Sequence, residues 1–149
     1  MPQSLRALVA VASIVLAGCA VIQPHVERVA KKLDCDGSRQ CTVHVTVSCP
    51  RYFACELATD YDLVFVPGKG KAVDIRWKLD GEAGAAFAAN GIVFGSSVFE
   101  CKPEGRAAFA CRDTHPDFGI YKYAINVTVN DSVFGPRGVQ SLDPWVVNY

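Results

Sequence analysis

The chain has a single methionine, at position 1, so a mature form without this residue offers no thioether sulfur to a soft metal such as Cu(I). Neither sign of charge is in excess, because fifteen Lys and Arg residues face fifteen Asp and Glu residues. A nucleic-acid-binding protein would carry a basic surplus, and a protein that binds anionic lipid headgroups would carry a polybasic segment. Neither kind of partner is expected from this charge balance.

Sequence motifs of several enzyme classes are also missing. The chain contains no Gly-x-Ser-x-Gly elbow, which would present a serine nucleophile. The run Gly68-Lys69-Gly70-Lys71 has the composition of a phosphate loop but not the Walker spacing, so a turn is predicted there. The cysteine spacings contain no C-x2–4-C pair of the kind that holds zinc. We therefore predict a protein that is not an enzyme and has no cofactor.

The beginning of the chain has the order of a secretory signal. Arg6 supplies a cation, an apolar run extends from Ala7 to Leu16, and small residues follow. The run is shorter than the ~20 residues that a membrane-spanning helix needs. This order favours export over the alternative of an uncleaved membrane helix.

The four residues Leu16-Ala17-Gly18-Cys19 closely resemble the lipobox of bacterial lipoproteins, which follows the apolar core of the signal. The resemblance implies a diacylglycerol group on the Cys19 sulfur, cleavage of residues 1–18 as a signal peptide, and acylation of the new amine. Two or three acyl chains anchor a protein stably in a membrane. In this family an aspartate after the cysteine favours the inner membrane. Ala20 stands there instead, so the resemblance implies a lipid-anchored protein of the outer membrane, facing the periplasm or the cell surface.

Removal of residues 1–18 would leave 131 residues, the size of one domain. Residues 19–34 form the lipidated N-terminus and a segment whose pattern leaves two structures open. A short amphipathic helix is one, because four apolar residues fit one helical face: Val26, Val29, Ala30 and Leu33. A tether that runs into a first strand is the other.

Six cysteines follow the lipobox: Cys35, Cys41, Cys49, Cys55, Cys101 and Cys111. An even number in an exported domain predicts disulfides. Cys41 and Cys49 stand at opposite ends of one predicted strand, too far apart to bond each other, since a disulfide needs Cα atoms within ~7 Å. The favoured pairs are therefore Cys35–Cys41 and Cys49–Cys55, with Cys101–Cys111 closing a hairpin.

Alternation of apolar and polar residues predicts strands along most of the remaining chain. The predicted strands are 41–49, 61–66, 72–79, 92–94, 98–101, 107–111, 121–129 and a final edge strand at 145–147. Residues 67–70 would turn strand 61–66 back onto strand 72–79, whose Trp77 points into the core. The Ala- and Gly-rich residues 81–91 predict a short helix or a loop that ends at Asn90-Gly91, and residues 130–144 a long connection.

Seven or eight short strands with little helix predict an all-β fold, an immunoglobulin-like antiparallel β-sandwich over residues 35–149. A second resemblance supports a recurring fold. The order Tyr121-Lys122-Tyr123, a β run and then Leu142 to Asn148 is similar to the ending of small uncharacterised proteobacterial proteins, and Trp77 and residues 91–94 fit the same pattern. This resemblance carries over no functional residue.

Few polar groups stand out as sites. His44 lies on the polar face of its strand, where solvation or a cross-strand pair explains it. Asp113, His115 and Asp117 alternate, so their side chains could converge on a metal ion, although Asp and Pro at 113–117 also build turns.

The leading hypothesis is a non-enzymatic binding or assembly role toward another envelope protein. The region 130–149 is the predicted contact surface, with Trp145 and Tyr149 as its aromatic residues. Closure of the core by Trp145 is the alternative reading of that residue. An inhibitor or immunity-type protein against an enzyme is the second hypothesis, and a metal- or ligand-binding module is the third.

Overall fold

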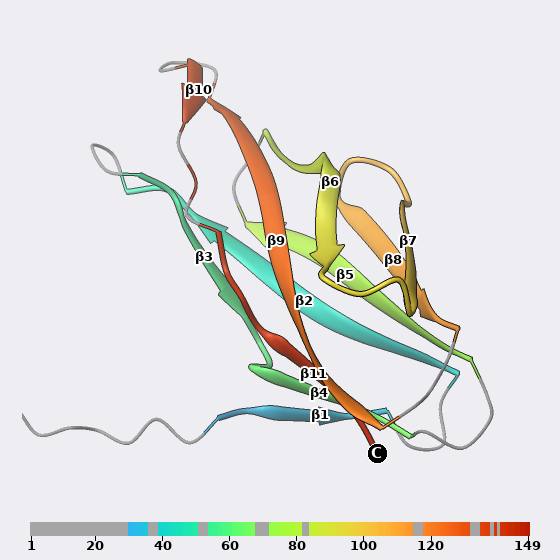
Figure 1. The fold of residues 1–149 in the computed structure, drawn as a ribbon. Coiled ribbons are helices and arrows are strands. Elements are labelled where there is room, and N and C mark those ends of the chain that lie inside the picture. Colours follow the sequence, from blue (N-terminus) through green and yellow to red (C-terminus); the bar gives the residue numbers. More distant parts are fainter. Residues whose placement is uncertain are drawn as a thin grey trace, which may run out of the picture.

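The computed structural model describes residues 30–35, 39–50, 54–67, 72–81, 84–114, 118–131, 135–137, 139 and 141–149. In these residues the chain forms eleven β-strands and no helix, arranged as two sheets (Figure 1). The prediction of an all-β, disulfide-stapled sandwich is confirmed, although the described strands outnumber the seven or eight expected.

The six-stranded sheet combines the first and the last strand of the described chain. Four neighbours follow one another across it: β1 (Lys32–Asp34), β4 (Leu63–Val66), β11 (Trp145–Asn148) and β9 (Gly119–Asp131). The long strand β9 pairs along its other edge with β6 (Ala85–Phe94), and beyond β11 it pairs with β10 (Gly135–Arg137). In Figure 1 β1, β4 and β11 lie together at the lower end of β9.

The five-stranded sheet contains the central part of the chain. Its order is β3 (Glu56–Thr59), β2 (Gln40–Ser48), β5 (Val73–Gly81), β8 (Ala108–Asp113) and β7 (Phe99–Pro103). The alternation predicted for β2 is confirmed, because its valines are buried while His44, Thr46 and Ser48 are exposed. This sheet therefore has one face in the core and one face in water.

An aromatic cluster joins the two sheets. Trp77 of β5 is fully buried, as predicted, and its indole Nε1–H donates a hydrogen bond to the Tyr123 hydroxyl of β9 at 3.2 Å. Phe94 of β6 stacks on Phe99 of β7 with ring centroids 3.8 Å apart. Burial raises the pKa of the Tyr123 phenol. The cluster thus satisfies its own buried polar atoms while it packs one sheet against the other.

Three disulfides fix the strand ends: Cys35–Cys41, Cys49–Cys55 and Cys101–Cys111. These are the pairs that proximity along the chain favours. The first pair links the residue after β1 to the beginning of β2, so it connects the two sheets covalently. The last pair lies at directly opposed positions of β7 and β8.

The pairing pattern differs from the expected antiparallel arrangement. β1 with β4, β4 with β11, and β2 with β5 are parallel, so both sheets are mixed. Strands β4 and β5 do not form the predicted hairpin, because they belong to different sheets. The chain leaves β2, contributes β3 and then β4, and crosses back to place β5 beside β2. Such a crossover is what parallel neighbours require.

Residues 81–91 were expected to form a short helix or a loop, and this prediction is wrong for residues 85–91. They belong to β6, which pairs with β9 on both sides of a register shift between Phe87 and Ile92. Tertiary pairing outweighs the low strand propensity of Ala and Gly here. Gly91 ends no helix. A Cβ at this position would lie 2.8 Å from the Phe109 ring and 2.9 Å from Phe87 Cβ, so close packing requires the glycine.

Both ends of the domain also differ from the prediction. Part of the expected connection 130–144 forms β10. β11 is not an edge strand, because it lies between β4 and β9. The sandwich begins with β1 at Lys32, slightly before the expected boundary at residue 35. The open question about residues 19–34 is answered only for β1, which is a strand, since residues 19–29 lie outside the described residues.

Candidate functional site

Strand β11 divides its side chains between the core and the surface. Val146 and Asn148 are buried, whereas Trp145, Val147 and Tyr149 point to the outer face of the six-stranded sheet. Trp145 and Tyr149 are each 41% exposed. Trp145 therefore lies at the surface, where the partner-surface hypothesis needs it, while Val146 fills the core.

The strand register places outward side chains of β1, β4, β11 and β9 in rows. The first row consists of Lys32, Leu63, Trp145 and Lys122. The second row consists of Asp34, Phe65, Val147 and Ile120. Tyr149 follows the second row, and its backbone N–H donates to the Val66 carbonyl, which continues the pairing of β11 with β4. Neighbours within a row are in side-chain contact range.

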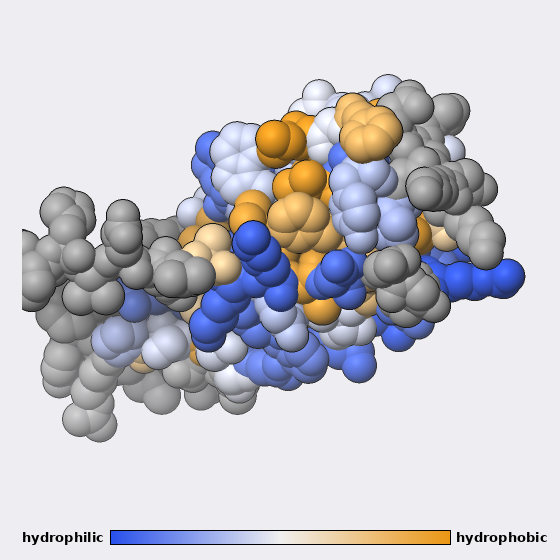
Figure 2. Space-filling view, turned by 90° about the horizontal axis from the view of Figure 1, so that it is seen from below, coloured by the Kyte–Doolittle hydropathy of each residue, from blue (hydrophilic) through white to orange (hydrophobic). Residues whose placement is uncertain are grey.

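We call the six apolar and aromatic residues of these rows and their continuation the apolar face: Leu63, Phe65, Ile120, Trp145, Val147 and Tyr149. Ile120 is 68% exposed, and Phe118, just before β9, is 85% exposed. Figure 2 shows this end of the molecule from below, with hydrophobic side chains gathered in a patch that hydrophilic ones border. Four of the five exposed large hydrophobic side chains described belong to it or adjoin it.

Polar contacts hold the aromatic rings of the apolar face in place. The Tyr149 hydroxyl donates to Asp34 Oδ1 at 3.2 Å, and its ring meets Phe65 edge to face at 6.1 Å. Lys32 Nζ lies 5.7 Å from the Phe65 ring centroid. Such contacts restrict rotamers in the free protein, so less conformational entropy remains to be lost on binding.

The border of the apolar face carries both signs of charge. Lys122 Nζ lies 5.9 Å from the Trp145 ring centroid and 2.9 Å from Asp143 Oδ2. On the β1 side, Lys32 and Asp34 alternate with the partly buried Leu33. This mixture gives the face polar borders without a net basic field.

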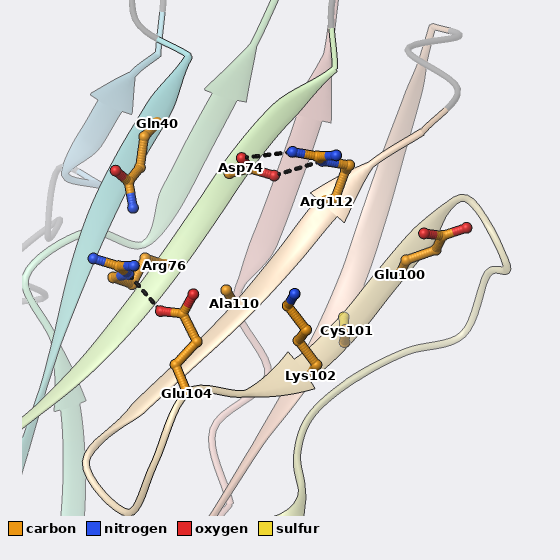
Figure 3. Close-up of a pocket in the computed structure, with 9 residues that line it drawn as sticks. All are labelled: Gln40, Asp74, Arg76, Glu100, Cys101, Lys102, Glu104, Ala110 and Arg112. Carbon is orange, nitrogen blue, oxygen red and sulfur yellow. Dashed lines mark hydrogen bonds and ion pairs between the residues drawn. The ribbon is translucent and has the colours of Figure 1, made fainter.

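The opposite surface of the sandwich, the outer face of the five-stranded sheet, is different in kind. It contains an open cavity of about 480 Å³ that is lined mainly by charged and polar residues, together with Cys101 and Ala110 (Figure 3). Ala110 of β8 leaves room between the longer side chains of β5 and β7, among them Arg76 and Lys102. We call this surface the charged face.

Ion pairs occupy much of the charged face. The Arg112 guanidinium donates two hydrogen bonds to the Asp74 carboxylate, at 2.8 and 3.1 Å, and these bonds lower the pKa of Asp74. Arg76 Nε lies 2.7 Å from Glu104 Oε2. Three cations and three anions line the cavity, so it offers a ligand no strong field of either sign. These pairs explain the alternation of charge along β5 without a bound ligand.

The remaining predicted polar sites have structural roles or lie outside the described residues. His44 pairs across strands with Asp80, Nδ1 to Oδ2 at 2.6 Å, as expected of a polar strand face. Asp113 is buried, and its Oδ2 accepts a hydrogen bond from Asn148 Nδ2 at 2.7 Å. His115, Asp117 and Cys19 lie outside the described residues, so the metal and lipidation predictions remain predictions.

Two further features bear on the function classes. Among the described residues, no three His, Cys, Asp or Glu side chains gather as the ligands of a metal ion would. Within the same part of the chain, no helix has the length and hydropathy that crossing a bilayer requires.

The sequence singled out Trp145 and Tyr149 as candidates but not the apolar residues that lie beside them on neighbouring strands. The run Leu63-Val64-Phe65-Val66 does contain a signal, because it lacks the alternation of a strand with one wet face. Ile120, an apolar residue in phase with the polar side of β9, is a second signal. Their meaning depends on the pairing of β4 with β11, which local patterns do not contain.

Comparison with known proteins adds no relative to this description. A scan against protein-family models finds no match, and a search of curated proteins finds no significantly similar sequence.

Proposed function

We propose that this protein is a lipoprotein of the bacterial outer membrane, anchored through Cys19, whose domain binds another envelope protein without catalysis. The apolar face is the proposed binding surface. The observation that carries this proposal is the exposure of Ile120, Trp145 and Tyr149 together on one side of a stapled sheet.

Exposed apolar groups gathered in one patch with a polar border are typical of interaction sites on soluble domains. Trp and Tyr are also enriched among the residues that dominate binding energy at protein interfaces. The apolar face presents a Trp and a Tyr on strands whose opposite side packs in the core. Its shape is therefore rigid before a partner binds. These features support recognition of a structured surface.

The charge of the border supports a protein as the partner. A patch that binds anionic membranes would be bordered mainly by cations. Here Lys32 alternates with Asp34, and Lys122 pairs with Asp143. A protein partner can meet such a mixed border with complementary charges.

Lipid attachment is tested by growing cells with radiolabelled palmitate and recovering the protein. The wild-type chain should carry the label and remain with the membrane fraction. Cys19→Ser should lose both, because the thiolate that accepts the lipid is gone. Label retained by Cys19→Ser would contradict the anchor.

Partner binding is tested with a photo-crosslinking amino acid placed at position 120 of the anchored protein in intact cells. Position 46, exposed on the outer face of β2, is the matched control. We expect a protein adduct from position 120 that position 46 does not give, and its loss when Trp145→Ala is added. Equal labelling from the two positions would contradict a binding role for the apolar face.

A further inference from the structure

We propose that the apolar face pairs two copies of this chain around a two-fold axis that crosses its strands between the first and second rows. This inference rests on the proposed function, since it names the partner of the same binding surface. We choose a second copy as the partner because the charged residues Lys32 and Asp34 on this face are arranged so that two copies can complement each other.

Two side chains of β1 provide the first step. Lys32 and Asp34 stand two residues apart, and their contacts place both on the outer face. Lys32 lies over the Phe65 ring, and Asp34 accepts a hydrogen bond from the Tyr149 hydroxyl. Opposite charges at this spacing can complement themselves when a second copy lies antiparallel to the first. An isologous interface has this property by symmetry, since each contact occurs twice.

Two orientations of the axis bring the faces together. An axis across the strands lays each strand antiparallel on its own counterpart, so the first row meets the second row of the other copy. Lys32 then faces the second copy's Asp34, and Trp145 faces the second copy's Val147. An axis along the strands would lay β1 on β9 and place Lys32 against Lys122, which is paired with Asp143, and Asp34 against Ile120. That orientation brings no opposite charges of the two rows together, so the charges of the rows favour the axis across the strands.

The position of β1 is compatible with this pairing in a membrane. This strand is at the edge of the sheet, and the chain that leads back to Cys19 enters it at Lys31. With the axis across the strands, the two β1 strands lie antiparallel at the same edge of the pair. Both chains therefore join the pair at one edge, which can face the bilayer in which both copies are anchored.

The size of the face indicates where such a pair forms. Four strands ~4.8 Å apart and about 13 Å of strand length, the span of the four residues of β4 or β11, give a flat area on the order of 250 Å². Stable soluble complexes bury ~800 Å² per partner. A shared membrane compensates for the small area, because confinement raises the effective concentration of the second copy. The pair is therefore expected in the membrane and is to be measured there.

The first test uses carbodiimide, which joins a lysine amine to a carboxylate in direct contact. Cells that express the full chain from two plasmids, with an epitope tag on one copy and none on the other, provide membranes with both forms. The expected product is a covalent pair of one tagged and one untagged copy, joined by an isopeptide bond between Lys32 and Asp34. The pair Lys122–Asp143, at 2.9 Å within one chain, serves as the internal positive control.

Charge reversal then separates the two orientations. The readout is the covalent pair of copies formed by the photo-crosslinking amino acid at position 120, because this reaction needs no lysine. Lys32→Asp should lower the yield of this pair at least about tenfold, because it places two carboxylates against each other in both symmetry-related contacts between the β1 strands. The double variant Lys32→Asp/Asp34→Lys should restore the yield, because the amine at position 34 then meets the carboxylate at position 32 of the opposite copy. A yield that Lys32→Asp raises would overturn the proposed axis.

A matched pair of surface variants tests whether the apolar face itself forms the contact. Ile120→Lys should abolish the carbodiimide crosslink between Lys32 and Asp34 of two copies, because it places a charge within the apolar face. Thr46→Lys on the outer face of β2 adds the same charge elsewhere and should leave the crosslink unchanged. Crosslinks between copies that survive Ile120→Lys would show that the copies meet elsewhere, and would overturn the inference.

The outcomes distinguish this inference from the proposed function. A protein adduct of different mass from position 120, with no crosslink between copies, would overturn self-pairing and leave partner binding intact. Adducts to lipid alone, or none, would overturn both.

Discussion

Two aromatic regions of this molecule contrast with each other: the cluster between the sheets and the apolar face outside them. In the cluster, Trp77 and Tyr123 are buried and satisfy each other's polar atoms. On the apolar face, Trp145 and Tyr149 remain partly in water, and the Tyr149 hydroxyl donates to Asp34 at the border. The same residue types therefore contribute to folding in one region and are left available for binding in the other.

The contrast arises within single strands. On β11 and β9 successive side chains point to opposite faces, so Val146 and Tyr123 contribute to the core while Trp145 and Lys122 lie outside. Neighbouring substitutions should consequently have different effects, with one changing stability and the next changing binding.

The largest expected effect is that of Trp77→Ala, which should lower the free energy of unfolding by about 3–5 kcal/mol. The indole is fully buried, and its loss leaves a cavity and removes the hydrogen bond to Tyr123. Urea denaturation followed by circular dichroism measures the change. Trp145→Ala is the matched control and should cost about 1 kcal/mol or less. Equal losses from the two variants would show that Trp145 belongs to the core after all.

A smaller effect is expected from Asn148→Ala, which removes the amide that donates to buried Asp113. Replacing one partner of a buried hydrogen bond costs about 1–3 kcal/mol. The residue links β11 to β8 and so joins the two sheets. Tyr149→Ala, one position further and outside the core, should change stability less but reduce crosslinking at position 120. A larger loss of stability from Tyr149→Ala would reverse this assignment of faces.

Local patterns predicted most strands because the alternation of apolar and polar residues indicates which side of a strand is buried. β2, β5 and β9 have unbroken alternation, and their buried residues are those the sequence indicated. The cysteine pairs were predicted from the same patterns, because cysteines separated by a short loop at the end of a strand lie close enough to bond each other. β6 was missed because Ala and Gly carry little strand signal, and its pairing with β9 determines its structure.

Strand pairing itself was not predictable from local patterns. Nothing near residues 67–71 signals that β4 and β5 belong to different sheets, since a turn between two strands looks alike in both cases. The candidate surface depends on this fact, because β4 pairs with β11 in one sheet while β5 pairs with β2 in the other. Trp145 could therefore be identified as a candidate, whereas Phe65 and Ile120 could not be placed beside it.

The smallest expected effect concerns the charged face, where acid should weaken the Asp74–Arg112 pair while the apolar face stays unchanged. The hydrogen bond from Arg112 holds the pKa of Asp74 below its ordinary value of 3.8. A carboxylate whose pKa is lowered on folding stabilises the native state above that ordinary value and loses this contribution as pH falls through the folded pKa. The stability difference between wild type and Asp74→Asn should thus be present at pH 7 and shrink below about pH 4, as measured by urea denaturation. It should also decrease in high salt, because both side chains are well exposed. Crosslinking from position 120 should be the same in Asp74→Asn as in wild type, because the two faces lie on opposite sides of the core. A pH-independent difference would mean that Asp74 acts through packing rather than through its charge.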